Sequence, residues 1–353
     1  MSFEKTEDID GPEFEYINKR CQEYGITWLP KKYHKRPRTL ATLLDIFTML
    51  LEIRKFIVKK EKVLVHCRGY VPAVAGLIAN KLFKVPYIFD MRALWIDEII
   101  ENGTLNKKSL LAKSLYKLEG WMLRSASHIV SLTESAIPYL LLKHKGISAD
   151  KFDVIPTCAA VEKFSYNKKD TKAPVIGTMG TLISGRIATS LIFDVMNAFK
   201  NNIENCGFKF ITRDCPKTIL MQNTANLDVD ITSATKETIN DELADLSLAL
   251  VFFTPGVGTL GTSPTRLGEM FAAGIPVIVN DGVGDVSKIV DKYRVGIVLK
   301  SEKPEAINQA VQEALNLLKE PDIVSRCLYA AKDYYSLDAG VSKLETLYNR
   351  EYQ

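Results

Sequence analysis

Cysteine and long apolar runs are both scarce in this sequence. The six cysteines are scattered and contain no C-x-x-C pair, so the pattern fits neither a disulfide framework nor a zinc site. No stretch approaches the eighteen or so uninterrupted apolar residues of a membrane-spanning helix. Residues 1–10 are acidic, unlike the basic start of a signal peptide. We therefore expect a protein that is made and kept in the reducing cytoplasm.

The chain also lacks a strong charge of either sign. Its 46 basic and 42 acidic residues leave a net charge of +4, which is not the global field of a dedicated nucleic-acid-binding protein. Any basic binding site must therefore be local. With 353 residues, 46% of them hydrophobic, the chain is long enough for two domains that each bury a core.

Apolar runs without polar alternation recur along the first half, separated by segments in which apolar residues have helical spacing. Such runs are typical of parallel strands buried on both faces. The runs lie at 62–66, 85–90, 128–132 and 152–156, and the helical segments at 39–59, 71–83, 108–124 and 134–143. This alternation predicts a Rossmann-like, doubly wound α/β domain over residues 1–161.

A polar, lysine-rich stretch at 162–172 interrupts this rhythm and is predicted to be a linker. A second α/β domain is predicted over 173–333. Its strands are expected at 175–179, 208–212, 248–253, 276–280 and 296–299, and its helices at 188–199, 237–244, 265–273 and 304–318. Residues 334–353 predict a C-terminal helical segment. Two such domains in sequence predict a central cleft between the carboxyl ends of their strands.

A loop of small residues at 256–262 follows the predicted strand at 248–253, and a helix begins directly after it. Ser263 and Thr265 are residue types that cap helices, and Pro264 suits a first turn. The exposed amides and the positive end of the helix dipole can hold phosphate there. Arg266 adds charge for a diphosphate, and Glu269, about one turn further on, can accept both hydroxyls of a ribose.

An alternative explains the same residues without a ligand. Gly274 and Pro276 then simply end the helix, Ser263 is its cap and Glu269 is a surface acid. The residues by themselves leave both interpretations open.

The run from Ser263 to Asp285 resembles the donor-site segment of family-four glycosyltransferases, in a branch whose helix starts with a Ser-Pro-Thr-Lys-like motif. Residues 89–98, which read Phe-Asp-Met-Arg-Ala-Leu-Trp-Ile-Asp-Glu, are similar to an Asp-x-Arg-Gly-x-Trp-x-Asp-Glu segment of that branch. Residues 154–157 match the end of its first domain. The resemblance implies the two-domain GT-B fold. It also implies retaining transfer of a sugar from a nucleoside diphosphate, usually UDP or GDP, without a metal or other cofactor.

On this basis the sequence predicts further site residues. Gly180 lies in a glycine-bearing turn after the strand at 175–179, and Arg186, which follows that turn, is expected on the diphosphate. Arg213, at the end of the next strand, is a weaker donor candidate for which a solvated arginine is an equal alternative. In the facing domain we assign catalytic roles to Asp90, Arg92 and Glu98.

Three more residues are assigned to the acceptor side, namely His66, Arg68 and Trp95. The assignments of Arg92 and His66 have structural alternatives. An ion pair from Arg92 to Asp97 or Glu98 would hold the loop without any role in binding, and His66 can be a neutral, packed histidine.

The sequence departs from the family at three places. Asp90 stands where many members have a histidine, and Gly261 where they have a glutamate eight residues before Glu269. The family also opens with a strand and a glycine-rich turn that precede the segment resembled by residues 2–5. A sheet without that strand exposes apolar edges, so we expect compensation, such as a partner subunit.

A basic cluster at 31–38 holds five lysines and arginines together with His34. Acidic phospholipid or a polyprenyl diphosphate suits such a cluster, and a solvated basic loop is the alternative. The resemblance thus implies a cytoplasmic glycosyltransferase that acts on a glycan or lipid-linked acceptor, and the basic cluster leaves contact with the inner face of the membrane open. A non-catalytic nucleotide-sugar-binding subunit and a nucleotide-sugar epimerase are the rival functions.

Overall fold

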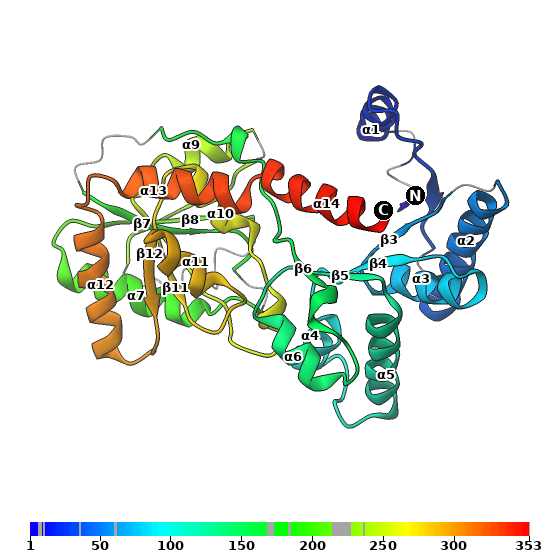
Figure 1. Cartoon of the computed structure of the whole chain (residues 1–353). Helices are drawn as coiled ribbons and strands as arrows, with labels where there is room; N and C mark the ends of the chain where they lie inside the picture. Colours follow the sequence, from blue (N-terminus) through cyan, green and yellow to red (C-terminus); the bar gives the residue numbers. More distant parts are fainter. Residues whose placement is uncertain are drawn as a thin grey trace. The chain divides into compact units, whose positions relative to one another are not determined.

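A computed structural model describes residues 1–5, 9, 11–34, 37–59, 62–167, 173–182, 185–213, 227–235 and 237–352 of the protein. The chain divides into two compact units (Figure 1). The first comprises residues 1–90 and 121–128, and the second comprises residues 91–120 and 129–353. The domain limits predicted from sequence, with a linker at 162–172, stay a prediction, and residues 168–172 lie outside the described part.

The first unit contains two pairs of parallel strands. β1 (Ser2–Glu4) pairs with β2 (Pro30–Lys32), and β3 (Val65–Arg68) pairs with β4 (Tyr87–Asp90). Its helices are α1 (Pro12–Glu23), α2 (Arg38–Val58) and α3 (Tyr70–Phe83). Gly69, at φ +92°, makes the tight turn from β3 into α3. α2 packs on α3, and Ala41, Asp45 and Met49 of α2 are buried.

The second unit is built around a six-stranded parallel sheet in the order β12-β11-β10-β7-β8-β9. The strands are β7 (Val175–Met179), β8 (Gly207–Ile211), β9 (Val229–Thr232), β10 (Leu248–Val251), β11 (Val277–Asn280) and β12 (Gly296–Leu299). This is the doubly wound order, in which the first strand lies at the centre and the chain crosses to the other half of the sheet at the fourth. The α/β class with parallel sheets is therefore confirmed.

Helices of the second unit follow or flank these strands. They are α7 (Thr189–Asn202), α9 (Ile239–Leu243), α10 (Thr265–Ala272), α11 (Val286–Tyr293), α12 (Pro304–Leu317), α13 (Ile323–Ala330) and α14 (Leu337–Tyr352). The second unit also contains α4 (Trp95–Glu101), α6 (Ala136–Lys143) and β6 (Phe152–Val154). Two elements, α5 (Leu110–Ser125) and β5 (His128–Ser131), continue from one unit into the other along the chain.

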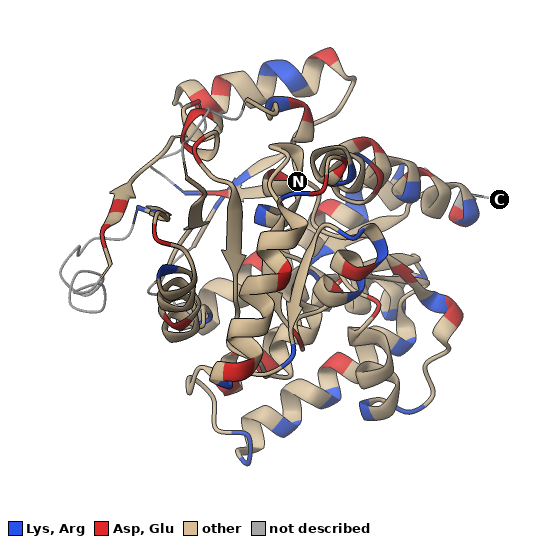
Figure 2. Ribbon diagram, turned by 90° about the vertical axis from the view of Figure 1, so that its left-hand side faces the viewer, with Lys and Arg blue, Asp and Glu red and all other residues tan. Residues whose placement is uncertain are grey.

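The central strands explain why the sequence shows apolar runs instead of alternation. Every residue of β10 and β11 is buried, as expected for a sheet covered on both faces. Charged residues lie mostly on helices and loops, with the two signs interspersed (Figure 2). Among the helices of the described residues, none combines the length and the apolar character that a membrane crossing needs.

Candidate donor site

The loops after β7 and β10 meet where the doubly wound sheet changes direction. Because β7 and β10 are neighbours and the chain leaves them toward opposite sides, their carboxyl ends form the switch point at which such sheets bind ligands. The structure brings the predicted Gly180 and Arg266 together at this point. A Cβ atom on Gly180 would lie 2.8 Å from a terminal nitrogen of Arg266, and Gly180 has φ +109°. Only glycine fits there.

Arg266 and Glu269 are half-buried on α10, one turn apart. The guanidinium carbon of Arg266 lies 5.5 Å from the centre of the Phe253 ring. Burial lowers the pKa of Arg266, whereas burial raises the pKa of Glu269 against the opposing effect of Arg266. The site therefore holds a guanidinium and a carboxyl group that are both partly shielded from water. Groups with pKa values shifted by burial are common in ligand sites.

Capping of α10 differs from the prediction. Pro264 is the N-cap and Thr265 the first helical residue, with no side-chain cap. The Ser263 hydroxyl instead accepts a hydrogen bond from the Thr157 backbone N–H at 3.1 Å. The expectation that Ser263 caps the helix was wrong, because its side chain is engaged by the segment that follows β6. The first turn of α10 thus keeps amides that no side chain caps.

Arg186 and Arg213 approach the same edge of the sheet. Arg186 forms an ion pair with Glu98, so a predicted donor residue and a predicted catalytic residue are in contact. Arg213 donates from two nitrogens to the carbonyl oxygen of Ala234, at 2.9 and 3.1 Å. It lines a pocket of about 190 Å³ that also includes Gly180 and Thr212.

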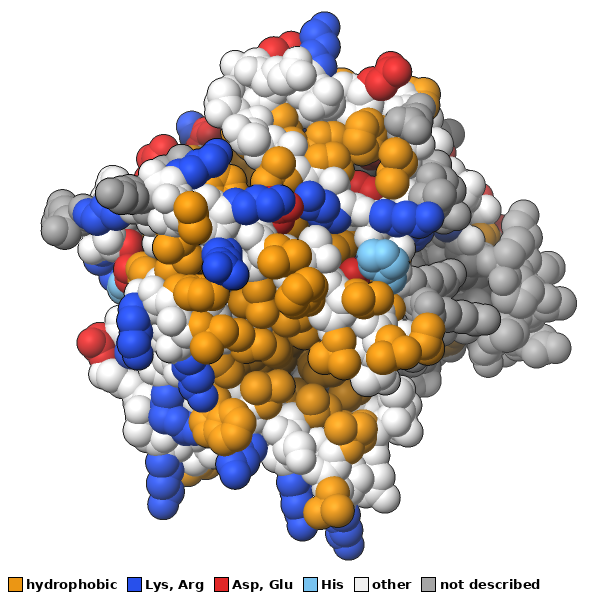
Figure 3. All heavy atoms as spheres, turned by 90° about the vertical axis from the view of Figure 1, so that its right-hand side faces the viewer, with side chains coloured by type: hydrophobic (Ala, Val, Ile, Leu, Met, Phe, Trp, Pro, Cys, Tyr) orange, Lys and Arg blue, Asp and Glu red, His pale blue; other side chains and the backbone are white. Residues whose placement is uncertain are grey.

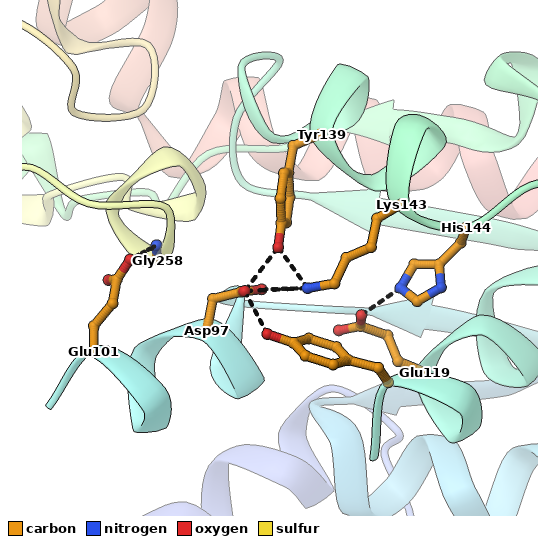
Figure 4. A network of polar contacts seen from close by, with 8 residues as sticks. Asp97, Glu101, Glu119, Tyr139, Lys143, His144 and Gly258 are labelled. Atoms are coloured by element: carbon orange, nitrogen blue, oxygen red, sulfur yellow. Dashed lines mark hydrogen bonds and ion pairs between the residues drawn. The ribbon is translucent and has the colours of Figure 1, made fainter. Parts of the chain in front are cut away.

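The short helix α4 is anchored by a polar network that the sequence did not reveal (Figure 4). Asp97 accepts hydrogen bonds from the hydroxyls of Tyr116 and Tyr139, both at 2.7 Å, and from the ammonium group of Lys143 at 3.0 Å. Beside them, buried His144 lies 2.5 Å from the carboxylate of Glu119. Asp97 therefore fixes α4 to α5 and α6.

α4 also reaches the small-residue loop at 256–262. The Glu101 carboxylate accepts a hydrogen bond from the Gly258 N–H, with both oxygens 3.1 Å from that nitrogen (Figure 4). Added Cβ atoms on Gly256 and Gly258 would lie 2.7 and 2.8 Å from Glu101, so the carboxylate rests directly on the loop. At Gly261, a Cβ atom would lie 3.0 Å from Leu94. Position 261, where many members of the resembling family have a glutamate, therefore has little room for a side chain.

The loop at 281–285 touches the loop at 256–262, since the Gly284 N–H donates to the carbonyl of Thr259 at 2.9 Å. Asp285 is buried, and its carboxylate accepts from the backbone N–H groups of Glu134 and Ser135 at 2.6 and 2.9 Å. The sequence marked this loop but not the role of Asp285, which holds the segment after β5.

The acceptor-side candidates fall into both units, and each group is described within its own. In the first unit, His66 and Arg68 lie on β3 opposite the end of β4. The imidazole of His66 lies 3.5 Å from the carboxylate of Asp90. In the second unit, Arg92 adopts φ +58°, a strained conformation for a residue other than glycine, and Trp95, which is partly exposed, begins α4.

Residues 12–158 match the family model of the glycosyl transferase 4-like domain. This part of the chain is similar to that domain, and the match covers less than half of the chain. No curated protein sequence matches the chain.

Among solved structures, a glycosyltransferase from Rickettsia africae is similar with a TM-score of 0.70 and 14% identity, covering 99% of this chain and 97% of that one. A sucrose-phosphate synthase from Thermosynechococcus elongatus has a TM-score of 0.67 and 12% identity, with 99% and 98% covered. Anabaena HepE in complex with UDP and glucose has a TM-score of 0.64 and 12% identity, with 98% of each chain covered. At these identities the likeness shows the fold, which is the GT-B fold of glycosyltransferases.

Proposed function

We propose that this protein transfers a sugar from a nucleoside-diphosphate sugar, with UDP or GDP as carrier, to a glycan or lipid-linked acceptor. The observation that carries the proposal is the arrangement at the sheet's switch point. There an arginine lies against a glycine turn, a carboxylate lies one turn further along the same helix, and a second arginine approaches from the loop after β7. The glycosyltransferase domain match and the structural likeness to HepE, which was solved with UDP, support the same class.

In the donor site we assign the diphosphate to Arg186, Arg266 and the start of α10 at residues 263–265, which no side chain caps. During transfer the bond from the anomeric carbon to the diphosphate oxygen breaks, and the nucleoside diphosphate leaves with the electron pair. The acceptor hydroxyl oxygen bonds to the anomeric carbon, and its proton passes to the leaving diphosphate. Cations and helix amides at that position stabilise the developing charge. Glu269 accepts the ribose hydroxyls, and the pocket beside Gly180 and Arg213 takes the rest of the nucleoside.

On the acceptor side we assign Asp90, Arg92 and Glu98 to the reacting groups, with His66, Arg68 and Trp95 as contacts of the acceptor. The support is the place of Asp90 at the carboxyl end of β4, of Arg92 and Glu98 in the segment that follows, and the strained backbone of Arg92. Retention of anomeric configuration follows from the resemblance of residues 263–285 to retaining enzymes. No metal or other cofactor is part of the proposal.

The exposed face of α2 is relevant to the kind of acceptor. Five apolar side chains with helical spacing, each between 43% and 60% exposed, form an apolar stripe: Leu40, Leu43, Leu44, Phe47 and Leu51. Figure 3 shows hydrophobic side chains gathered on this side of the molecule, with Lys and Arg side chains around them. An apolar area of this kind on a protein surface marks an interaction site.

The charges on α2 favour one partner. Among the described side chains of α2, the exposed charged ones are Arg54 and Lys55, whereas those of Asp45 and Glu52 are only 9% and 12% exposed. Asp45 pairs with His34, and Glu52 pairs with Lys31 and Lys55. An apolar face with cations and covered carboxylates fits a membrane surface rich in acidic phospholipid. Of the basic cluster at 31–38, Lys35, Arg36 and the side chain of Arg38 lie outside the described residues. We therefore place the enzyme at the inner face of the membrane, beside a lipid-linked acceptor.

Vesicle sedimentation tests the stripe. We expect the protein to bind vesicles of phosphatidylglycerol mixed with phosphatidylcholine and to bind pure phosphatidylcholine more weakly. The double variant Leu44→Asp with Phe47→Asp should lose at least tenfold in binding, while the control Leu142→Asp, at an 82% exposed position on α6, should not. If the double variant binds as the wild type does, or if it instead dissociates a dimer seen by light scattering, the stripe does not contact membrane.

Calorimetric titration with UDP, GDP, CMP and ADP tests the donor site. One of the two diphosphates UDP and GDP should bind, and Glu269→Ala should weaken its binding at least tenfold, because the ribose contact is lost. Glu313→Ala, which removes an exposed acid of α12, is the matched control. Absence of binding by all four nucleotides contradicts the donor site. Incubation with UDP- and GDP-sugars separates the rivals, since an epimerase changes the sugar and a binding subunit leaves it intact.

A further inference from the structure

Glu98 and Glu101 of α4 lie against two groups that suit a donor diphosphate. Glu98 pairs with Arg186, and Glu101 accepts the hydrogen bond of the Gly258 N–H. An arginine fork and a backbone N–H in a glycine-bearing loop are the groups that bind phosphate oxygens in proteins. In this structure each of them is engaged by a carboxylate.

The two carboxylates come from an element that is held firmly elsewhere. Asp97, which precedes Glu98 on the same helix, accepts hydrogen bonds from two tyrosine hydroxyls and from Lys143 of α5 and α6 (Figure 4). The side chain of Asp97 is only 8% exposed. α4 is thus fixed by Asp97, while Glu98 and Glu101 make contacts that an incoming anion can replace.

From this geometry we infer that Glu98 and Glu101 are exchanged for the diphosphate when the donor binds. The inference rests on the proposed function. Arg186 then releases the carboxylate of Glu98 and binds a phosphate oxygen. The Gly258 N–H likewise releases Glu101 and donates to a phosphate oxygen. Both carboxylates oppose donor binding, first by occupying these groups and then by repelling the bound anion. The side chain of Arg186 is 54% exposed, so its ion pair with Glu98 is weak enough to be displaced.

The exchange gives Glu98 a second task. Once Arg186 binds phosphate, the Glu98 carboxylate is released next to the donor, where it can accept a hydrogen bond from the acceptor hydroxyl. Glu101, which lies against the loop, has no such task. The two residues therefore differ in their expected effect on turnover, although both limit donor affinity.

Titration of UDP into the full chain and its variants tests the inference. Glu98→Gln and Glu101→Gln should each bind UDP about fivefold more tightly than the wild type, and Glu313→Gln should bind as the wild type does. In an Arg186→Ala background, which binds UDP more weakly, Glu98→Gln should have at most half of its effect because the ion pair is already gone. With a sugar donor, Glu98→Gln should lower turnover while Glu101→Gln retains it.

The outcomes separate the two proposals. Unchanged or weaker UDP binding by both glutamine variants, with thermal unfolding like that of the wild type, overturns the exchange and leaves α4 a purely structural support. The same holds if Glu98→Gln acts fully in the Arg186→Ala background. If neither the wild type nor any variant binds UDP or GDP, the proposed function itself fails.

Discussion

Burial of a single residue, Glu269, affects the pH range in which the proposed donor site can bind a nucleotide. Burial raises its pKa above the ordinary 4.5, and Arg266 only partly opposes this. A ribose contact through both hydroxyls requires the ionised carboxylate, which accepts hydrogen bonds and donates none. Donor binding is thus linked to a proton equilibrium that lies closer to neutral pH than that of a surface glutamate.

We therefore expect UDP affinity to fall as pH drops from 7.5 toward 5, because Glu269 takes up a proton at a pH above its ordinary value. In Glu269→Gln, binding should be weaker at pH 7.5 and should lose this dependence. Calorimetric titrations at several pH values check this, with the proton affinity of UDP measured separately. The same slope in the wild type and in Glu269→Gln would show that another group is responsible. Folding has the opposite sign: a raised folded pKa favours the protonated form, so this contribution to stability is complete below pH 4.5 and is lost as the pH rises through the folded pKa.

At the scale of elements, α4 depends on Asp97 more than on its own length. Seven residues are too few for a helix that is stable alone, so tertiary contacts hold it. Burial lowers the pKa of Lys143, and the Asp97 carboxylate opposes this by stabilising the ammonium form. A buried cation that loses its carboxylate is far more costly than the loss of an exposed pair.

Replacing Asp97 by alanine should lower the free energy of unfolding by about 3 kcal/mol, because the Lys143 ammonium and two tyrosine hydroxyls lose their acceptor. Adding Lys143→Met should restore the stability to within about 1 kcal/mol of the wild type, since the uncompensated charge is then gone. Urea unfolding of the single and double variants measures both effects. Equal stability of Asp97→Ala and the double variant would mean that the pair carries no buried-charge penalty.

Elements with strong apolar runs were predictable, and those held by distant contacts were not. Strands β7, β11 and β12 were predicted to within a residue, because buried parallel strands leave continuous runs. α1 was missed, since its charged sequence has no buried residue. The missed elements also include α4, α11, α13, β1, β2 and β9.

The candidate site was predictable to a similar degree. Helix chemistry suggested Arg266 and Glu269 and the family resemblance suggested Gly180, and the structure brings Gly180 and Arg266 together, with Glu269 one turn further along α10. The contact of Glu101 with Gly258 joins residues 157 positions apart, and no local pattern in the sequence predicts it. The exchange of carboxylates for phosphate could therefore be inferred only from the structure.

At the scale of the whole molecule, the two units differ in what holds them together. The large contiguous core, with Phe199, Phe210 and Phe271 fully buried, lies within residues 176–335 of the second unit. In the first unit many fully covered side chains are alanines, such as Ala73 and Ala79, and the leucines of α2 are half exposed. Because apolar burial scales with area, the first unit gains less free energy on folding.

We therefore expect two transitions in scanning calorimetry, with the first unit unfolding at the lower temperature. UDP at about 100 times its dissociation constant should stabilise the second unit by about 2.7 kcal/mol and raise the upper transition by about 5–10 °C. The lower transition should stay within about 1 °C, since the donor residues all belong to the second unit. Glu269→Ala should abolish the shift at the same UDP concentration. A single transition that moves as a whole would mean that the two units unfold cooperatively, so that donor binding stabilises the acceptor side as well.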